Sequence, residues 1–309
     1  MTRATALRDG TGYTFPPAPG RLLGPWRLPE EPLPELPEVE TLRRDLDSEV
    51  VGRKVKGVDV KAASAVRRHP SRADFTDRLL GRKVAEVGRR GSTLLLRLDD
   101  GAVLTIRLGA SGRLLKERSA ALVEQRTDAV ITFATGGDLR VLGLGDDGEL
   151  FVAAPGDEEA GPRAPSAAID PLTDAFTWQA LNARLLARGA RLRPLLTDES
   201  FLAGIGPIYA DEILWASALR WDRRSDRLTA QEVRRLYRAI QEVVQEAVRL
   251  RGTSVGDDLH VDLYGNKGEY QSQLNAYQRE GQPCQRCRTP LVREQLEQAS
   301  TFHCPKCQS

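Results

Sequence analysis

Four cysteines near the end of the chain form the pattern with the clearest chemistry. Two residues stand between Cys284 and Cys287, and two between Cys304 and Cys307, and the 16 residues 288–303 separate the two pairs. Two such pairs are the usual ligands of a tetrahedral structural zinc ion, with each pair on a tight turn and a hairpin between them. We therefore predict one zinc ion per chain. Its role is structural, because four protein ligands leave no position for a reactive water molecule.

Two disulfides or unpaired thiols are the alternative for these cysteines. Residues 1–33 contain six of the 18 prolines and do not begin with positive charges followed by an apolar run. This segment therefore indicates a flexible leader and not a secretory signal. Because disulfides are rare in the cytoplasm, a chain without an export signal favours zinc over disulfides.

A second pattern that could bind a ligand is the turn 204–207, Gly-Ile-Gly-Pro, in front of a predicted helix from Ile208 to about Ala218. Proline fits the first turn of a helix, where its missing N–H costs nothing. The backbone N–H groups at such a helix start can hold a phosphate. Most glycine turns of this kind are only structural, so the pattern alone leaves phosphate binding open.

The overall charge limits the kind of partner. The chain has 45 Lys and Arg against 43 Asp and Glu, a net charge of +2, so any site for a polyanion must be a local patch. We find no apolar run long enough for a membrane span and expect a cytoplasmic protein.

The elements that must position these groups change in type along the chain. Residues 51–152 consist of short β-branched and leucine-rich runs, with hairpins predicted around residues 99–101 and 136–137. A helix is predicted at 39–50 before them. The proline-rich and acidic segment 155–165 is the best linker candidate. After it the period becomes helical, and Thr229 with Glu232 predicts a capping box at the start of a long helix.

Three separated segments resemble the formamidopyrimidine-DNA glycosylase and endonuclease VIII family, and its formamidopyrimidine branch in particular. Residues 34–41, Pro-Glu-Leu-Pro-Glu-Val-Glu-Thr, followed by two arginines, are similar to its amino terminus. Residues 204–212 are similar to its helix-two-turns-helix element, and residues 277–308 to its zinc finger. Their order and spacing agree over roughly residues 34–309.

This resemblance implies an α+β multidomain fold that binds double-stranded DNA carrying a damaged base or an abasic site. After the leader 1–33 it implies a β-sandwich with a leading helix at 34–155, a helix-two-turns-helix domain at 156–270 and a zinc-finger hairpin at 271–309. It also implies a monomer in the cytoplasm, associated with the nucleoid when bound to DNA.

The resemblance further implies which residues act. In the family the first proline of the mature protein attacks C1′ of the damaged nucleotide and forms a Schiff base, and the next glutamate acts as general acid. By position these are Pro34 and Glu35. An α-amino group titrates near pH 8, so a terminal proline is a competent nucleophile at neutral pH. Residues at the DNA-contacting positions are Gly206, Tyr209, Arg107 and Arg279.

The chain departs from the family at Pro34 itself. In this sequence 33 residues precede Pro34, and the nitrogen of an internal proline is a tertiary amide without a usable lone pair. Either removal of the leader or translation from Leu33 would restore a terminal proline. The alternative is that the motif serves only as the start of a helix.

Other departures remove groups that touch DNA in the family. Ser92 stands where the family has lysine, Ala110 where it has a methionine wedge, Pro207 where it has asparagine and Ala299 where it has an arginine. Residues 143–148, with Asp146 and Asp147, replace a loop with arginine and phenylalanine that fills the space of the extruded base. Lost cations and added acids weaken phosphate binding.

Two functions fit these observations. The first is a DNA glycosylase and abasic-site lyase of altered specificity, active once Pro34 is terminal, on a lesion that needs little help to leave the stack. The second is a non-catalytic member of the family that binds DNA or acts as an interaction module. Retention of Pro34 and Glu35 favours the first hypothesis, and the substituted positions favour the second.

Overall fold

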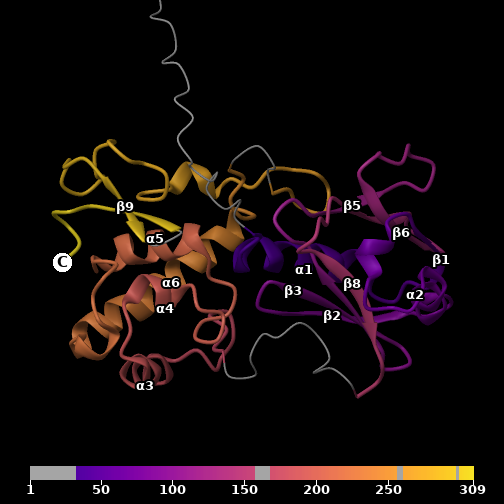
Figure 1. Ribbon diagram of the computed structural model, residues 1–309, viewed down its shortest axis with the longest axis horizontal. Helices are drawn as coiled ribbons and strands as arrows, with labels where there is room; N and C mark the ends of the chain where they lie inside the picture. Colours follow the sequence, from indigo (N-terminus) through magenta and orange to yellow (C-terminus); the bar gives the residue numbers. More distant parts are fainter. Residues whose placement is uncertain (1–32, 157–167, 256–259, 297–298) are drawn as a thin grey trace, which may run out of the picture. The chain divides into compact units, whose positions relative to one another are not determined.

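The computed structural model describes residues 33–156, 168–255, 260–296 and 299–309, and it confirms an α+β fold in which a part with two sheets and two helices precedes a mainly helical part (Figure 1). The predicted leader up to residue 32 and most of the predicted linker lie outside the described residues. Within those ranges, none of the helices has the length and apolar character needed to cross a bilayer.

Two four-stranded antiparallel sheets form the first part of the chain. The first sheet has the strand order β1 (Val55–Val60), β6 (Thr127–Phe133), β7 (Asp138–Leu142) and β5 (Arg113–Glu117). The second has the order β2 (Val84–Arg90), β3 (Thr93–Leu98), β4 (Val103–Arg107) and β8 (Glu149–Ala153). Both predicted hairpins are confirmed, as β3–β4 and β6–β7.

One apolar core joins these sheets to the helices α1 (Leu36–Val50) and α2 (Arg72–Leu79). Alternating residues of the strands point into it, as expected for sheets that are packed on one face. Helix α1 contributes Val39, Leu42, Leu46 and Val50, which recur at helical spacing and are all buried. The helix predicted at 39–50 is therefore confirmed, and it begins three residues earlier because Pro37 fits its first turn.

The second part of the chain is helical. Its elements are α3 (Trp178–Arg188), α4 (Leu192–Leu196), α5 (Pro207–Ser217), the 3₁₀ turn η3 (Ser225–Arg227) and α6 (Ala230–Arg249). The predicted capping box is confirmed at α6, where the N–H of Glu232 donates to Thr229 Oγ1 and the N–H of Thr229 donates to Glu232 Oε2. The apolar stripe of α6 is buried against α5, beside which it lies in Figure 1.

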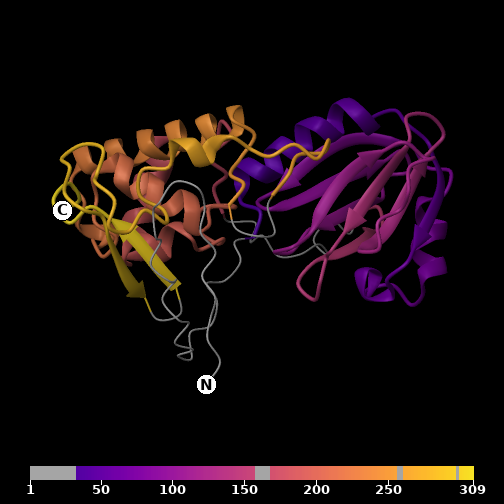
Figure 2. The same cartoon turned by 90° about the horizontal axis from the view of Figure 1, so that it is seen from above.

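The last part is a two-stranded hairpin of β9 (Val292–Leu296) and β10 (Ala299–His303), preceded by the 3₁₀ turn η4 (Tyr270–Gln273). Figure 2 shows this hairpin in yellow, and β10 contacts α5. Tyr277 and Phe302 pack edge to face and belong to the core of the helical part. The finger therefore shares a core with the helices in front of it.

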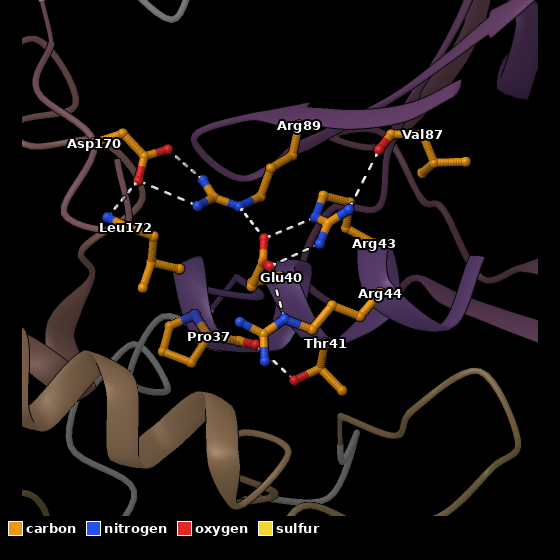
Figure 3. Close-up of polar contacts among 9 residues, drawn as sticks. All are labelled: Pro37, Glu40, Thr41, Arg43, Arg44, Val87, Arg89, Asp170 and Leu172. Atoms are coloured by element: carbon orange, nitrogen blue, oxygen red, sulfur yellow. Dashed lines mark hydrogen bonds and ion pairs between the residues drawn. The ribbon is translucent and has the colours of Figure 1, made fainter. Parts of the chain in front are cut away.

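A buried ionic network fastens α1 to its neighbours (Figure 3). Arg89 on β2 donates to Glu40 Oε2 at 2.8 Å and, through its other two nitrogens, to both carboxylate oxygens of Asp170. Arg43 and Arg44 complete the set by donating to Glu40. Asp170 directly precedes the helical part, so Arg89 joins the β-rich and helical parts of the chain.

The charge of Glu40 is fixed by this network. Burial alone would raise the pKa of Glu40, but hydrogen bonds from Arg43, Arg89 and Arg44 outweigh it and lower the pKa to about 2. Glu40 is therefore ionised at every pH at which the protein is expected to fold. Because α1 begins just after Pro34 and Glu35, the network also fixes where those two residues lie.

We predict that Arg89→Met lowers the free energy of unfolding by on the order of 3 kcal/mol, because it leaves the Asp170 carboxylate without its ionic partner. Arg44→Met is the matched control, since the Arg44 side chain is 57% exposed and makes one bond to the same glutamate. It should cost less than about 1 kcal/mol. Urea unfolding of both variants tests this, and equal losses would contradict it.

Candidate active site and zinc centre

The carboxylate of Glu35 occupies the start of α5. Glu35 is 3% exposed and accepts hydrogen bonds from the N–H groups of Gly206 at 2.7 Å, Ile208 at 2.8 Å and Tyr209 at 3.3 Å. These are the N–H groups that a helix leaves unpaired at its start, where the helix dipole also favours negative charge. The helix start that the sequence offers to a phosphate thus holds a carboxylate of the chain itself.

Gly206 is required by this close approach. A Cβ atom at residue 206 would lie 2.6 Å from Glu35 Cδ, a distance that real Cβ atoms essentially never show. Its backbone is extended, with φ of −108°, so the glycine is needed for space and not for conformation. The DNA contact that we predict at Gly206 stays a prediction, and its N–H is already bonded to Glu35.

A second buried carboxyl, Glu38, lies beside the first. Its Oε2 accepts from the N–H of Glu35 at 3.0 Å, and its Oε1 accepts from the Tyr209 hydroxyl at 2.5 Å and the N–H of Thr253 at 2.7 Å. Tyr209 is fully buried and its hydroxyl also contacts Thr253 Oγ1. The side chain of Tyr209, which we predict at a DNA-contacting position, therefore lies inside the protein and hydrogen-bonds to Glu38 of the carboxyl pair.

Burial dominates the ionisation of this pair. It raises the pKa of Glu35, as does the charge of Glu38, and the three N–H donors lower it only partly, so the pKa stands at about 8. Burial also raises the pKa of Glu38. At neutral pH the pair retains a proton, and a carboxyl of raised pKa can donate a proton as a general acid.

Pro34 lies at the wall of two cavities. The larger has a volume of about 240 Å³ and is lined by Pro34, Arg90, Ser92, Arg107 and the neighbouring backbone. The smaller, of about 30 Å³, lies between Pro34, residues 110–113 and His260. The volume of the larger cavity is slightly below the roughly 300–1,000 Å³ of typical small-molecule sites.

Arg107 and Ser92, which line the larger cavity, make hydrogen bonds within the protein. Arg107 donates from Nε and Nη2 to the carbonyl oxygen of Asp147, at 3.0 and 2.8 Å. Ser92, at the position of the family's lysine, donates to Glu199 Oε1 at 3.3 Å. The cavity therefore presents the carboxylates of Glu199 and Asp147 beside its arginines.

Arg279 lies apart from this cavity. Its Nε donates to Gln282 Oε1 at 2.9 Å and its Nη1 to the carbonyl oxygens of Leu274 and Asn275. These contacts shape the loop in front of the finger. Of the predicted residues, the structure brings Pro34, Glu35, Gly206, Tyr209 and Arg107 together, and it holds Arg279 elsewhere through contacts within its own loop.

Sequence reasoning missed Glu38, Thr253 and Glu199 as parts of the site. Glu38 has a signal, because Glu35 and Glu38 stand at the spacing of a capping box, with the N–H of Glu35 bonded to Glu38. Gly252 next to Thr253 is a second signal, since a Cβ there would lie 2.7 Å from Glu38 Oε1. Glu199 has no local pattern that would have identified it.

The four cysteines converge at the finger. Their Sγ atoms all lie within 4.8 Å of one another, with 4.0 Å between Cys284 and Cys307 and 3.5 Å between Cys287 and Cys304. A tetrahedral zinc ion with Zn–S bonds of about 2.3 Å places its sulfurs about 3.8 Å apart. A disulfide needs about 2.0 Å, and all four cysteines are free. The thiolates therefore form the site of one structural zinc ion, and the disulfide alternative is wrong.

The finger is held to the far end of α5. Arg286 stacks over the Trp215 ring at 4.0 Å and donates to the carbonyl oxygens of Trp215 and Ala216. In the middle of α5, the fully buried Asp211 accepts from Arg193, Thr301 and the N–H of Phe302. One helix thus contacts Glu35 at its start and the finger along the rest of its length.

Known domains match the chain in the order that the sequence predicts. The Formamidopyrimidine-DNA glycosylase N-terminal domain matches residues 33–145. The Formamidopyrimidine-DNA glycosylase H2TH domain matches residues 167–258. The zinc finger found in FPG and IleRS matches residues 281–309.

Whole proteins match as well. The formamidopyrimidine-DNA glycosylase of Thermobifida fusca is 41% identical over 289 residues, which cover 89% of this chain and 97% of that protein. The MutM (FPG) protein from Thermus thermophilus has a TM-score of 0.79 at 35% identity, covering 89% of this chain and 98% of that one. A Lactococcus lactis Fpg in complex with DNA containing an abasic site has a TM-score of 0.77 at 25% identity, covering 89% and 99%.

We predict that Glu35 makes the protein less stable as the pH rises from about 4.5 to 8. Over this range the folded state keeps a proton on Glu35 and the unfolded state does not, so the free energy of unfolding falls by up to about 1.4 kcal/mol per pH unit. Glu35→Gln removes this titration. The free energy of unfolding of the parent minus that of the variant should therefore fall as the pH rises from about 4.5 to 8. Urea unfolding at several pH values measures this difference.

The control for this measurement is Glu246→Gln. The Glu246 side chain is 43% exposed, and its hydrogen bond with Arg249 lowers its pKa, so this variant should leave the pH dependence above 4.5 as it is in the parent. A stability difference between the parent and Glu35→Gln that stays constant from pH 4.5 to 8 would show that Glu35 titrates as an ordinary glutamate.

We predict that Cys304→Ala abolishes stoichiometric zinc binding and unfolds the finger, because a short hairpin without its metal buries too little apolar surface to stay folded. The sheets and the helices α3 to α6 should remain largely intact. Metal analysis should give one zinc ion per parent chain and less in the variant, with circular dichroism to follow the helices. A parent protein that contains no zinc would refute the prediction.

Proposed function

Because the chain belongs to the formamidopyrimidine-DNA glycosylase family, we propose that it binds double-stranded DNA with a damaged base or an abasic site around Pro34. Solved relatives from Lactococcus lactis are complexes with DNA that contains Fapy-dG or an abasic site. We place the activity in the cytoplasm, on nucleoid DNA, with a monomer as the acting unit and one structural zinc ion.

One observation carries this proposal. Pro34 lines a cavity of about 240 Å³ together with Arg90 and Arg107, and the buried carboxyl of Glu35, which follows it in the chain, retains a proton at neutral pH. A nucleophile position next to a general acid is the arrangement that Schiff-base chemistry at a sugar requires. Arg107 and Arg279 remain the proposed DNA-contacting residues. Gly206 and Tyr209, which the resemblance also places at DNA-contacting positions, act on the site through the fold of α5, because the Gly206 N–H is bonded to Glu35 and the Tyr209 side chain is buried.

The proposed reaction at an abasic site is an addition followed by loss of water. The nitrogen of a terminal Pro34 adds to the C1′ aldehyde carbon of the opened sugar, and the proton of this nitrogen passes to the aldehyde oxygen, which becomes a hydroxyl. The resulting hydroxyl leaves as water after it takes a proton from Glu35, and an iminium ion remains. Borohydride reduces this iminium ion to a stable amine, which joins protein and DNA covalently. An internal Pro34 cannot start this sequence, because its amide nitrogen is not basic.

Non-catalytic DNA binding is the second candidate function. It is favoured by the carboxylates of Glu199 and Asp147 in the cavity, since these repel the phosphates that would accompany a nucleotide. The family fold and its DNA surface would then serve to bind an altered site in DNA without cleaving it.

We predict that a chain beginning at Pro34 is trapped on an abasic oligonucleotide by borohydride, whereas the 309-residue chain is not. Glu35→Gln in the shortened chain should slow trapping by about tenfold or more, because it removes the proton donor. Ser92→Lys with Ala299→Arg in the shortened chain should increase trapping, since both changes add cations at phosphate-facing positions. The readout is the shifted band on a denaturing gel.

Two results would count against this reaction. Equal trapping by the 309-residue chain would identify another amine as the nucleophile. If the shortened chain with both added cations forms no adduct but still binds the abasic oligonucleotide, the non-catalytic function is supported.

A further inference from the structure

Two loops stand next to Pro34 and are joined to each other. The β4–β5 loop comprises residues 108–112, and the β7–β8 loop comprises residues 143–148. Both contribute to the larger cavity, through Gly109 and Asp147, and the β4–β5 loop also lines the smaller cavity, through Ala110 to Gly112. A nucleotide bound in the larger cavity beside Pro34 would therefore lie against these loops.

Asp147 ties the two loops together. Its Oδ2 accepts from the N–H of Ala110 at 3.0 Å, and its carbonyl oxygen accepts two hydrogen bonds from Arg107 at the base of the first loop. The loops are also in close contact at Gly109, where a Cβ atom would lie 2.7 Å from Asp147 Oδ1 and 2.8 Å from the nitrogen of Gly148. The two loops thus form one closed unit.

The side chains of this unit are short. The β4–β5 loop presents Ala110 and Ser111 between two glycines, and the exposed part of the β7–β8 loop is Gly145, Asp146 and Asp147. No side chain of these two described loops is both long and apolar at an exposed position, since Leu108 and Leu144 are buried. The unit has nothing to insert into a base stack.

Insertion matters because extruding a nucleotide from a duplex has a cost. The nucleotide loses its stacking and pairing, and proteins that open duplex DNA usually offset this with an inserted apolar side chain. The cost is least where the nucleotide is already unpaired. Because the two joined loops carry only short and acidic side chains at exposed positions, they do not offset the cost of extruding a nucleotide from an intact base pair.

We propose that the chain takes its substrate nucleotide from DNA in which that nucleotide is already outside the stack, as in a bulge or a single strand. This proposal rests on the proposed DNA binding and narrows it to a class of substrate. The two joined loops then contact the DNA without inserting a side chain, and the extrahelical nucleotide binds in the larger cavity beside Pro34.

The test compares two duplexes that differ only in whether a nucleotide stands opposite the abasic residue. Each carries one tetrahydrofuran residue, a stable abasic-site analogue, either opposite cytosine or as a bulge with no nucleotide opposite. The 309-residue chain should bind the bulged duplex at least about tenfold more tightly than the paired one by fluorescence anisotropy. A tetrahydrofuran single strand should also bind more tightly than the paired duplex, and undamaged duplex sets the baseline.

A variant tests whether the short loops are the cause. Ala110→Met adds a long apolar side chain at the exposed edge of the β4–β5 loop, and it should narrow the ratio between bulged and paired duplex by about threefold or more. Ala73→Met, on the exposed face of α2, is the matched control and should leave the ratio unchanged.

The outcomes separate this proposal from the one on which it rests. If the paired duplex binds as tightly as the bulged one, and both bind above the undamaged baseline, the proposed DNA binding stands and the extrahelical preference is overturned. If no tetrahydrofuran DNA binds above the baseline, both are overturned. An unchanged ratio in Ala110→Met assigns the preference to another part of the chain and overturns the role of the loops.

Discussion

The carboxylate of Glu35 on the first N–H groups of α5 is the contact on which the site depends. It joins the start of α1 to a helix far along the chain, since Gly206 stands 171 positions after Glu35. Burying a polar group is costly unless its atoms are hydrogen-bonded, and the three N–H donors bond the buried Glu35 carboxyl only in one geometry. The position of Pro34, and through α5 that of the finger, follows from this geometry.

The local features of the fold could be predicted from the sequence, because each depends on residues close together in the chain. The Thr229 capping box, the two hairpins and the cysteine pairs are of this kind, and all have the structure that their patterns indicate. The occupant of the α5 start could not be predicted in the same way. A glycine before a helix shows that N–H groups are available, but it does not show which distant group bonds to them.

The same limit applies to charge. From the sequence, Asp146 and Asp147 are simply two acids in a loop where phosphate should pass. In the structure the Asp147 carboxylate accepts a hydrogen bond from the N–H of Ala110, and the Asp147 carbonyl oxygen accepts one from the Arg107 guanidinium. Similarly, Arg89 stands next to Arg90 in the sequence, but in the structure its guanidinium is paired with Glu40 and Asp170. The cationic character of a surface depends on such pairings, which join residues from different elements.

The packing of Gly206 against Glu35 also bears on how this sequence can change over generations. Any larger residue at 206 would strike the carboxylate, and loss of the carboxylate would leave three helix N–H groups buried without an acceptor. Natural selection on folding alone is thus enough to keep both residues. A lineage that abandoned the reaction would still inherit Glu35, while the surface residues at 92, 110 and 299 would be free to drift.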